Sequence, residues 1–327
     1  MLAGAEGLGR GTSISNKLWS NNMALQQQRK PAQRGALMPV LLILLGLAVL
    51  LYPVVATQWN NFRQAKVAED YQSLMNDAVE KDPDAMQAAI DAAREYNRRG
   101  KGGPIIDPWS SRDATGNAEY QEYLGQLSGL PAMAQIVIPS IKVNLPVFHG
   151  TSDEVLAKGV GHLYGTSLPV GGADTHAVLT GHTGLTNATL FDNLTEMKRG
   201  DAIYLAVFGE KLKYEVYDTQ VVLPEDTKSL LNEPGQDLLT LVTCTPYGIN
   251  THRLLVHAKR VPMDPDDSVF EDAGTPIQWW MWAILAVALV VILLLIWWLR
   301  RQKKKRKEGD LDPVRHWPGE LPGAGSR

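Results

Sequence analysis

The sequence from Leu238 to Arg253 reads LLTLVTCTPYGINTHR. Its first seven residues are Leu, Thr and Val up to Cys244, a composition that predicts a buried β-strand. Pro246 and Gly248 then favour a turn, and a second strand is expected from Arg253. In an antiparallel pair joined by this eight-residue loop, positions 244 and 253 lie side by side, with Cβ atoms ~5 Å apart. Cys244 therefore ends its strand at a point where a side chain becomes accessible.

Cys244 is the single cysteine of the chain, so no internal disulfide is expected. Its thiol is then either buried and inert or reactive. A guanidinium at position 253 favours the thiolate and can donate two hydrogen bonds to a substrate carbonyl or its oxyanion. Arg253 cannot act as a base, because it is effectively never deprotonated. The alternative is an ordinary solvated arginine at a strand edge.

A nucleophilic cysteine also needs a proton partner, and the chain has seven histidines. His182 ends the predicted strand 177–181, directly after Gly181, and so occupies a strand end as Cys244 does. The remaining histidines lie in loops, in strands without that context, or in the C-terminal tail: His149, His162, His176, His252, His257 and His316. Because exposed and core histidines are common, the residues alone favour His182 without excluding the others.

Short strands dominate the sequence from residue 134 onward, with Val and Ile frequent in them and Gly, Pro, Asn and Asp between them. Strands are predicted at 134–138, 145–148, 177–181, 202–208, 211–223, 238–244 and 253–259, and short helical stretches at 152–156, 190–197 and 227–232. Upstream, apolar residues recur at three- and four-residue spacing from about residue 60 to residue 99, with an interruption at Lys81-Asp82-Pro83. The predicted fold class is mainly β: a closed β-barrel with short helices, an N-terminal helical pair and two transmembrane helices.

Two uncharged apolar blocks, at 37–56 and 277–299, are the basis for the transmembrane helices. At about 1.5 Å per residue each reaches roughly 30 Å, the thickness of a bilayer's hydrocarbon core. Basic residues precede the first block and follow the second, so both tails are expected in the cytoplasm and residues 57–276 outside. The alternatives are a cleaved signal peptide for the first block and two buried core helices.

The net charge is −3, and the basic runs lie in the two tails. This charge distribution gives no indication of a basic surface that would bind nucleic acid. No zinc-binding His-Glu-x-x-His spacing, EF-hand loop or phosphate-binding glycine loop occurs, so no cofactor and no metal are expected.

Residues 240–244, TLVTC, match the TLxTC signature of sortases, and the run through TPYGINTHR to Arg253 resembles the class C (pilus-assembly) members of that family. Thr180-Gly181-His182 matches the family's TGH, about sixty residues upstream. The resemblance covers roughly residues 60–300, including both apolar blocks. One departure is His257-Ala258, where Arg-Gly is expected, and it leaves the chemistry intact.

The resemblance implies a membrane-anchored cysteine transpeptidase of Gram-positive bacteria. Cys244 would attack the Thr–Gly bond of an LPxTG-like sorting signal, Arg253 would hold the carbonyl, and His182 would protonate the leaving amine and later activate the incoming one. In pilus assembly that amine is a lysine of the next pilin. Asp107-Pro108-Trp109 resembles the class C lid, in which Asp107 would pair with Arg253 while Trp109 covers Cys244. Taken alone, it is an ordinary loop.

The expected organisation follows from these assignments. It comprises a disordered cytoplasmic tail at 1–36, a transmembrane helix at 37–56, an N-terminal helical region at 57–103, the lid loop at 104–113, the catalytic barrel at 114–265, a linker at 266–276, a transmembrane helix at 277–299 and a basic cytoplasmic tail at 300–327. Two other functions stay open. One is a sortase that anchors surface proteins to the cell wall or mainly hydrolyses its substrates, and the other is a non-enzymatic membrane-anchored β-domain with a structural cysteine.

Overall fold

The structure, a computed structural model, describes residues 34–100, 105–109, 117–264, 268–270 and 277–310. The chain divides into two compact units, one from Leu51 to Leu285 and one made of the segments before and after it. The first unit contains the barrel and everything that bears on the site. The second contains the outer ends of two long apolar helices.

The N-terminal helical region consists of α2 (Arg34–Lys81) and α3 (Pro83–Arg99). Their junction is set locally, because the Asp82 side chain accepts the Ala85 N–H at 2.9 Å and Pro83 occupies the first helical turn. Gly100 ends α3 in the left-handed conformation, with φ of 61°. The sequence predicted separate segments at 37–56 and from residue 60, whereas α2 is one continuous helix through both.

The second apolar helix is α6 (Trp279–Asp310). It extends past the predicted end at residue 299 into the basic segment. Both α2 and α6 are long and apolar enough to cross a membrane, with mean hydropathy of 2.6 and 2.9 in their apolar windows. They are therefore candidate membrane spans by length and composition.

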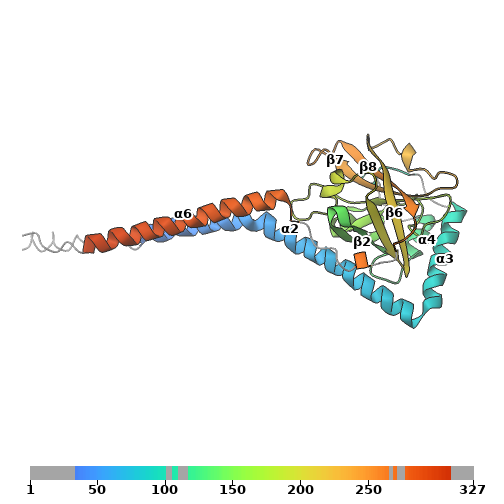
Figure 1. Ribbon diagram of the computed structural model, residues 1–327, viewed down its shortest axis with the longest axis horizontal. Helices are drawn as coiled ribbons and strands as arrows, with labels where there is room; N and C mark the ends of the chain where they lie inside the picture. Colours follow the sequence, from blue (N-terminus) through green and yellow to red (C-terminus); the bar gives the residue numbers. More distant parts are fainter. Residues whose placement is uncertain (1–33, 101–104, 110–116, 265–267, 271–276, 311–327) are drawn as a thin grey trace, which may run out of the picture. The chain divides into compact units, whose positions relative to one another are not determined.

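The strands close into a barrel in the order β1-β2-β3-β4-β7-β8-β6-β5. Figure 1 labels β2, β6, β7 and β8 of this barrel. The pairs β2/β3 and β4/β7 are parallel, and the other neighbours are antiparallel. The strands are β1 (Ala134–Ile138), β2 (Val143–His149), β3 (Val160–His162), β4 (Thr175–Thr180), β5 (Ala202–Val207), β6 (Glu210–Val222), β7 (Asp237–Thr245) and β8 (His252–Val261). Short helices lie between some of the strands: η1 (Pro139–Ile141), α5 (Asp153–Lys158), η2 (Asp192–Glu196) and η3 (Lys228–Leu230). α4 (Ala118–Gly125) precedes β1, and η4 (Ser268–Phe270) follows β8.

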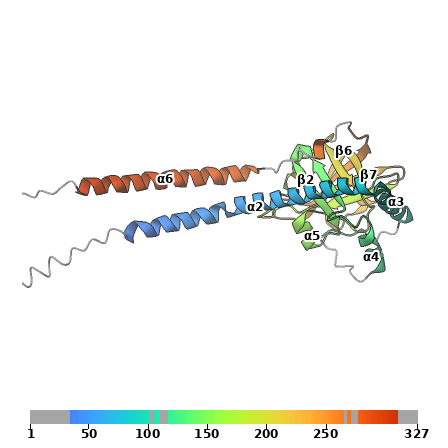
Figure 2. The same cartoon turned by 90° about the horizontal axis from the view of Figure 1, so that it is seen from below.

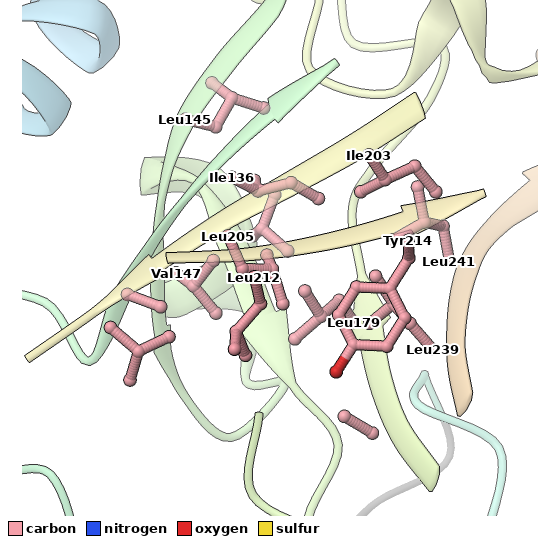
Figure 3. Packing of buried hydrophobic residues seen from close by; sticks show 14 of the residues in the cluster. Ile136, Leu145, Val147, Leu179, Ile203, Leu205, Leu212, Tyr214, Leu239 and Leu241 are labelled. Atoms are coloured by element: carbon pink, nitrogen blue, oxygen red, sulfur yellow. The ribbon is translucent and has the colours of Figure 1, made fainter. Parts of the chain in front are cut away.

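The barrel interior is filled by alternate residues of its strands, and Figure 3 shows them converging from several sides. The side chains labelled there include Ile136, Leu179, Leu205 and Leu241, each fully buried. β7 is buried along both faces, because Leu239 and Leu241 point into the barrel while Val242 packs outside it with Val178 and Leu255. Burial on both faces explains why its sequence reads as an almost continuous apolar run.

The second half of α2 packs across the outside of the barrel (Figure 2). Tyr71 and Met75 of α2 join Val137, Tyr204 and Phe270 in one apolar cluster. Phe270 is 3% exposed and belongs to η4, so part of the segment predicted as a linker at 266–276 is a packed turn. Residues 266–267 and 271–276 of that segment lie outside the described residues.

The predicted closed barrel is confirmed, and the predicted strands are all present with ends that differ by at most two residues. One further strand, β3, was not predicted from the sequence. It is three residues long with a glycine in the middle, too short to show an alternating pattern.

Candidate active site

Two strand pairings place the predicted site residues at one edge of the barrel. Cys244 of β7 lies directly opposite Arg253 of β8, as the sequence spacing predicted. β4 runs parallel to β7, with Thr180 opposite Val242. Because the carboxyl ends of neighbouring parallel strands leave a sheet at the same edge, His182 emerges beside Cys244. A hydrogen bond from the Gly181 N–H to the Val242 carbonyl, 3.1 Å long, continues that pairing to the residue before His182.

A threonine and a glycine fix the backbone around His182. The Thr243 hydroxyl donates to the Gly181 carbonyl at 2.8 Å, which ties the residue before the cysteine to the residue before the histidine. A Cβ atom on Gly181 would lie 2.6 Å from the Phe191 ring, so only glycine fits there. The Phe191 N–H in turn donates to the His182 carbonyl at 3.0 Å. No role for Thr243 was predicted from the sequence. Its polar side chain on the Leu239/Leu241 face of β7 was the available signal.

Arg253 is held by a bidentate ion pair with Asp107. Its Nε donates to Asp107 Oδ1 at 2.6 Å and one terminal nitrogen donates to Oδ2 at 2.9 Å. The other terminal nitrogen donates to the carbonyls of Asn250 and His252. Arg253 and Asp107 are only 8% and 7% exposed. Planar, buried, charge-assisted pairs of this kind are the strong ones.

Trp109 links Arg253 to His182. The guanidinium carbon of Arg253 lies 4.7 Å from the centre of the indole ring, within cation–π range. The indole N–H donates to His182 Nδ1 at 3.3 Å. Ile105 and Trp109 pack on an apolar cluster that includes Val242. The predicted lid residues are therefore in contact with the predicted catalytic residues. Residues 104 and 110–113 of the predicted lid loop lie outside the described residues.

Two further hydrogen bonds hold this segment against the barrel. The Thr151 hydroxyl donates to the Pro108 carbonyl at 3.1 Å, and the Thr227 hydroxyl donates to the Ile105 carbonyl at 3.5 Å. Both donors are side chains on neighbouring connections, Thr151 before α5 and Thr227 before η3.

Burial keeps both predicted reacting groups in their neutral forms while this segment is in place. Burial raises the pKa of the Cys244 thiol, the nearby Arg253 charge opposes that rise, and the Asp107 charge adds to it. Burial lowers the pKa of His182, against the attraction of Asp153. The arrangement therefore favours an uncharged thiol beside an uncharged imidazole.

A second histidine network lies further down the same strands. His176 donates from Nδ1 to the Leu231 carbonyl, and its Nε2 contacts the Thr240 hydroxyl at 2.6 Å. The same hydroxyl contacts His257 Nδ1 at 2.7 Å. Burial lowers the pKa of His257 to about 4, so this network is neutral at physiological pH. Among the described residues, no three His, Cys, Asp or Glu side chains are grouped so as to hold a metal ion.

Comparisons with known proteins give matches in sequence and in overall fold. The family model described as "Sortase domain" matches residues 136–261. Sortase D of Bacillus subtilis (strain 168) is 30% identical over 155 residues, which is 46% of this chain and 73% of that protein. The solved structure of sortase C-1 from Actinomyces oris is 54% identical, with a TM-score of 0.54, and the match covers 55% of this chain and all of that one. The chain belongs to the sortase family.

Other sortases show how far the match extends. Sortase A of Streptococcus agalactiae serotype III (strain NEM316) is 34% identical over 133 residues, and the chain spans about half, 53%, of that protein's length, or 40% of its own. Sortase A from Corynebacterium diphtheriae is 47% identical, with a TM-score of 0.56, over 64% of this chain and 99% of that structure. Class C sortases are among the structural neighbours. Sortases of this family are cysteine transpeptidases.

Proposed function

We propose that this sortase is a pilus-assembly transpeptidase that cleaves an LPxTG-like sorting signal and transfers the acyl group to a pilin lysine. The observation that carries the proposal is the meeting of Cys244, Arg253 and His182 at one edge of the barrel. A nucleophile, a cation for the developing oxyanion and a proton carrier are the three groups that acyl transfer needs.

In the first half of the proposed reaction, the Cys244 thiol passes its proton to His182 once the lid has left, and the resulting thiolate attacks the carbonyl carbon of the signal's threonine. The carbonyl oxygen becomes an oxyanion, which Arg253 stabilises with its N–H groups. The tetrahedral intermediate collapses, the carbon–nitrogen bond to glycine breaks, and His182 donates a proton to the departing amine. A thioester to Cys244 remains.

In the second half, the acceptor amine attacks the thioester carbon while the neutral imidazole of His182 takes its proton. The carbon–sulfur bond breaks, the thiolate is regenerated and an amide is formed. Proton donation and acceptance by one imidazole require its pKa to lie near the working pH. Release of His182 from the Trp109 indole exposes it to solvent and moves its pKa back toward the usual value.

The Asp107–Trp109 segment acts as a lid in this proposal. It engages Arg253 with a carboxylate and Nδ1 of His182 with an indole N–H, so the guanidinium and this ring nitrogen are occupied until the segment leaves. Support comes from relatives. A Corynebacterium diphtheriae sortase A structure, 50% identical with a TM-score of 0.52, is described as a lid mutant. A Streptococcus pneumoniae sortase C structure, 37% identical with a TM-score of 0.55, is described as giving insights into pilin substrate specificity.

The experiment uses the full chain in detergent micelles, incubated with a pilin that carries a C-terminal sorting signal and with the same pilin lacking its lysines. Wild type, Cys244→Ala and the double variant Asp107→Ala/Trp109→Ala are compared on denaturing gels. Covalent ladders are expected only with Cys244 and only with the lysine-bearing pilin, and the lid variant is expected to give more product.

The alternative outcomes each overturn part of the proposal. Cleavage without ladders moves the assignment to a cell-wall-anchoring or hydrolytic sortase. Absence of any Cys244-dependent product with several sorting signals favours the non-enzymatic alternative. Equal product from wild type and the lid variant removes the gating role.

We also propose that α2 and α6 span the cell membrane with both tails in the cytoplasm and the barrel outside, in the domain order predicted above. The basic residues outside both apolar blocks support this orientation. The single cysteine provides a direct test. A membrane-impermeant maleimide is expected to label Cys244 of the lid variant on intact cells, and labelling that requires permeabilised cells reverses the topology.

A further inference from the structure

The face of α2 that meets the barrel changes character along its length. Thr57, Asn61 and Gln64 are polar yet only 1%, 6% and 6% exposed, and they are followed on the same face by apolar Ala68 and Tyr71. Residues spaced by three and four positions share one side of a helix. The polar half of the face begins one residue after the first apolar block ends.

The polar half binds the loop that follows His182. Asn61 and Thr189 form two reciprocal hydrogen bonds, because Asn61 Nδ2 donates to Thr189 Oγ1 at 2.8 Å and the Thr189 N–H donates to Asn61 Oδ1 at 3.0 Å. Asn60 donates to the Asn187 carbonyl at 2.8 Å, and Thr57 donates to the Thr186 carbonyl at 3.3 Å. These contacts from α2 together hold residues 186–189.

The same loop determines where the His182 backbone lies. Two residues after Thr189, the Phe191 N–H binds the His182 carbonyl and the Phe191 ring packs on Gly181. Displacement of Thr189 therefore moves the Phe191 contacts that fix His182.

The chemistry of the contact indicates more than simple docking. Burying an amide is costly unless it is hydrogen-bonded, and both polar ends of the Asn61 side chain are paired with Thr189. Gln64, one turn further along the same face, has a buried Oε1 with no hydrogen-bond partner among the described residues. A fully satisfied buried polar pair defines one geometry, which an apolar contact does not.

We propose that Asn61, through Thr189, is a positioning residue for His182, so that the base of the membrane-proximal helix sets the geometry of the proton-transfer step. The inference rests on the proposed function, in which His182 carries the proton. The hydrogen bonds of both side chains join them to each other and not to Cys244, Arg253 or the lid, so their effect is expected on the histidine side of the site.

The test compares four variants of the full chain in detergent micelles. Thr189→Val removes the hydroxyl at nearly constant volume, and Thr189→Ser restores it. Asn61→Ala removes the amide, and Gln64→Ala is its matched control on the same face. Kinetics of sorting-signal transfer and alkylation of Cys244 by iodoacetamide are measured for each.

Thr189→Val and Asn61→Ala are expected to lower kcat about 10- to 100-fold, the range that a displacement of about 1 Å costs a catalytic group, with KM and the alkylation rate unchanged. Thr189→Ser and Gln64→Ala are expected to keep wild-type kcat. A wild-type kcat in Thr189→Val overturns the proposal, as does an equal loss in Gln64→Ala, which would indicate general loosening of the helix.

Hydrogen exchange of peptides covering residues 182–192 gives a readout that does not need activity. Faster exchange is expected in Thr189→Val and not in Gln64→Ala, and unchanged exchange overturns the proposal. Failure of the proposed function is recognised separately, because wild type then forms no Cys244-dependent product while the exchange comparison still reports on the contact between Asn61 and Thr189.

Discussion

Replacing Asp107 by Asn is the sharpest test of the electrostatics at Cys244. The change keeps the size of the side chain and removes its charge, so the Arg253 guanidinium loses the carboxylate that it pairs with at 2.6 Å. The Asp107 charge raises the pKa of the Cys244 thiol, and the Arg253 charge lowers it. Removing the first and leaving the second must lower the pKa of the thiol and increase the thiolate fraction at neutral pH.

The size of the effect follows from the register of β7 and β8. Paired Cβ atoms lie ~5 Å apart, and the carboxylate sits one hydrogen bond beyond the guanidinium, so ~7 Å is a fair separation between the Asp107 charge and the Cys244 sulfur. Two unit charges at ~7 Å interact by about 2 kcal/mol at an effective permittivity of ~20. That energy changes the thiolate fraction by a factor of ~30. If water enters the gap between the two charges, the energy is about half as large and the factor is ~5.

The assay is the rate of Cys244 alkylation by iodoacetamide, a neutral reagent, from pH 6 to pH 10. Asp107→Asn is expected to react about 5- to 30-fold faster than wild type below the pKa of the thiol, and the two curves should converge at high pH. Trp109→Ala removes cover and is expected to react faster across the whole range. Asp226→Asn, an exposed aspartate before η3, is the control. Identical curves for wild type and Asp107→Asn, with circular dichroism showing both folded, would rule out this electrostatic coupling.

Three further predictions concern stability and local geometry. Gly181→Ala places a Cβ atom 2.6 Å from the Phe191 ring. It is expected to lower the unfolding free energy in urea titrations by about 1–3 kcal/mol, because overpacking forces neighbouring atoms to shift. A change smaller than the error of the titration contradicts this prediction. Tyr71→Phe leaves the buried Phe208 N–H without the acceptor that it binds at 3.1 Å. The free energy of unfolding is expected to fall by about 1–3 kcal/mol with kcat unchanged. A thermal unfolding midpoint equal to that of wild type argues against the hydrogen bond. Burial lowers the pKa of His162 to about 4, below its value of about 6.5 in the unfolded chain. As the pH falls, the unfolded state therefore binds a proton at His162 before the folded state does. The stability that neutral His162 contributes is lost between about pH 6.5 and pH 4. Urea midpoints across that range should fall less steeply in His162→Gln, and an unchanged slope counts against this assignment.

The local residue pattern of the sequence predicted most of the strands and the pairing of Cys244 with Arg253. The Leu/Val/Thr run and the Pro/Gly turn predicted the β7–β8 hairpin, and the eight-residue loop predicted that Cys244 faces Arg253. These features lie within sixteen residues of each other, so spacing alone constrains them. The strand pattern from residue 134 likewise predicted the barrel, because strands leave a period-two signal that survives without knowledge of their partners.

The sequence pattern did not predict contacts between segments that lie far apart along the chain. His182 lies beside Cys244 only because β4 and β7 pair in parallel, and a separation of sixty residues carries no information about that pairing. The physical argument from residues left several histidines open, and the resemblance to sortases selected one. The continuity of α2 was missed because the change from apolar to mixed composition near residue 57 suggested a break, whereas helical hydrogen bonds depend on the backbone and not on polarity.

The hydrogen-bonding state of Arg253 has a consequence for which molecules the enzyme can accept. Its two bonds to Asp107 and two to the carbonyls of Asn250 and His252 occupy four of the five N–H donors that an arginine possesses. A peptide carbonyl is a weaker acceptor than a carboxylate, so an exchange of Asp107 for a scissile carbonyl is uphill by itself. The deficit must be recovered by contacts elsewhere on the ligand. The apparent affinity equals the intrinsic affinity multiplied by the fraction of molecules in which Asp107 has left Arg253. In the proposed mechanism, short peptides that carry the signal alone are therefore disadvantaged relative to folded proteins that touch the barrel over a wider area. In that mechanism the Asp107–Arg253 pair would select for large ligands before Arg253 takes part in any chemistry.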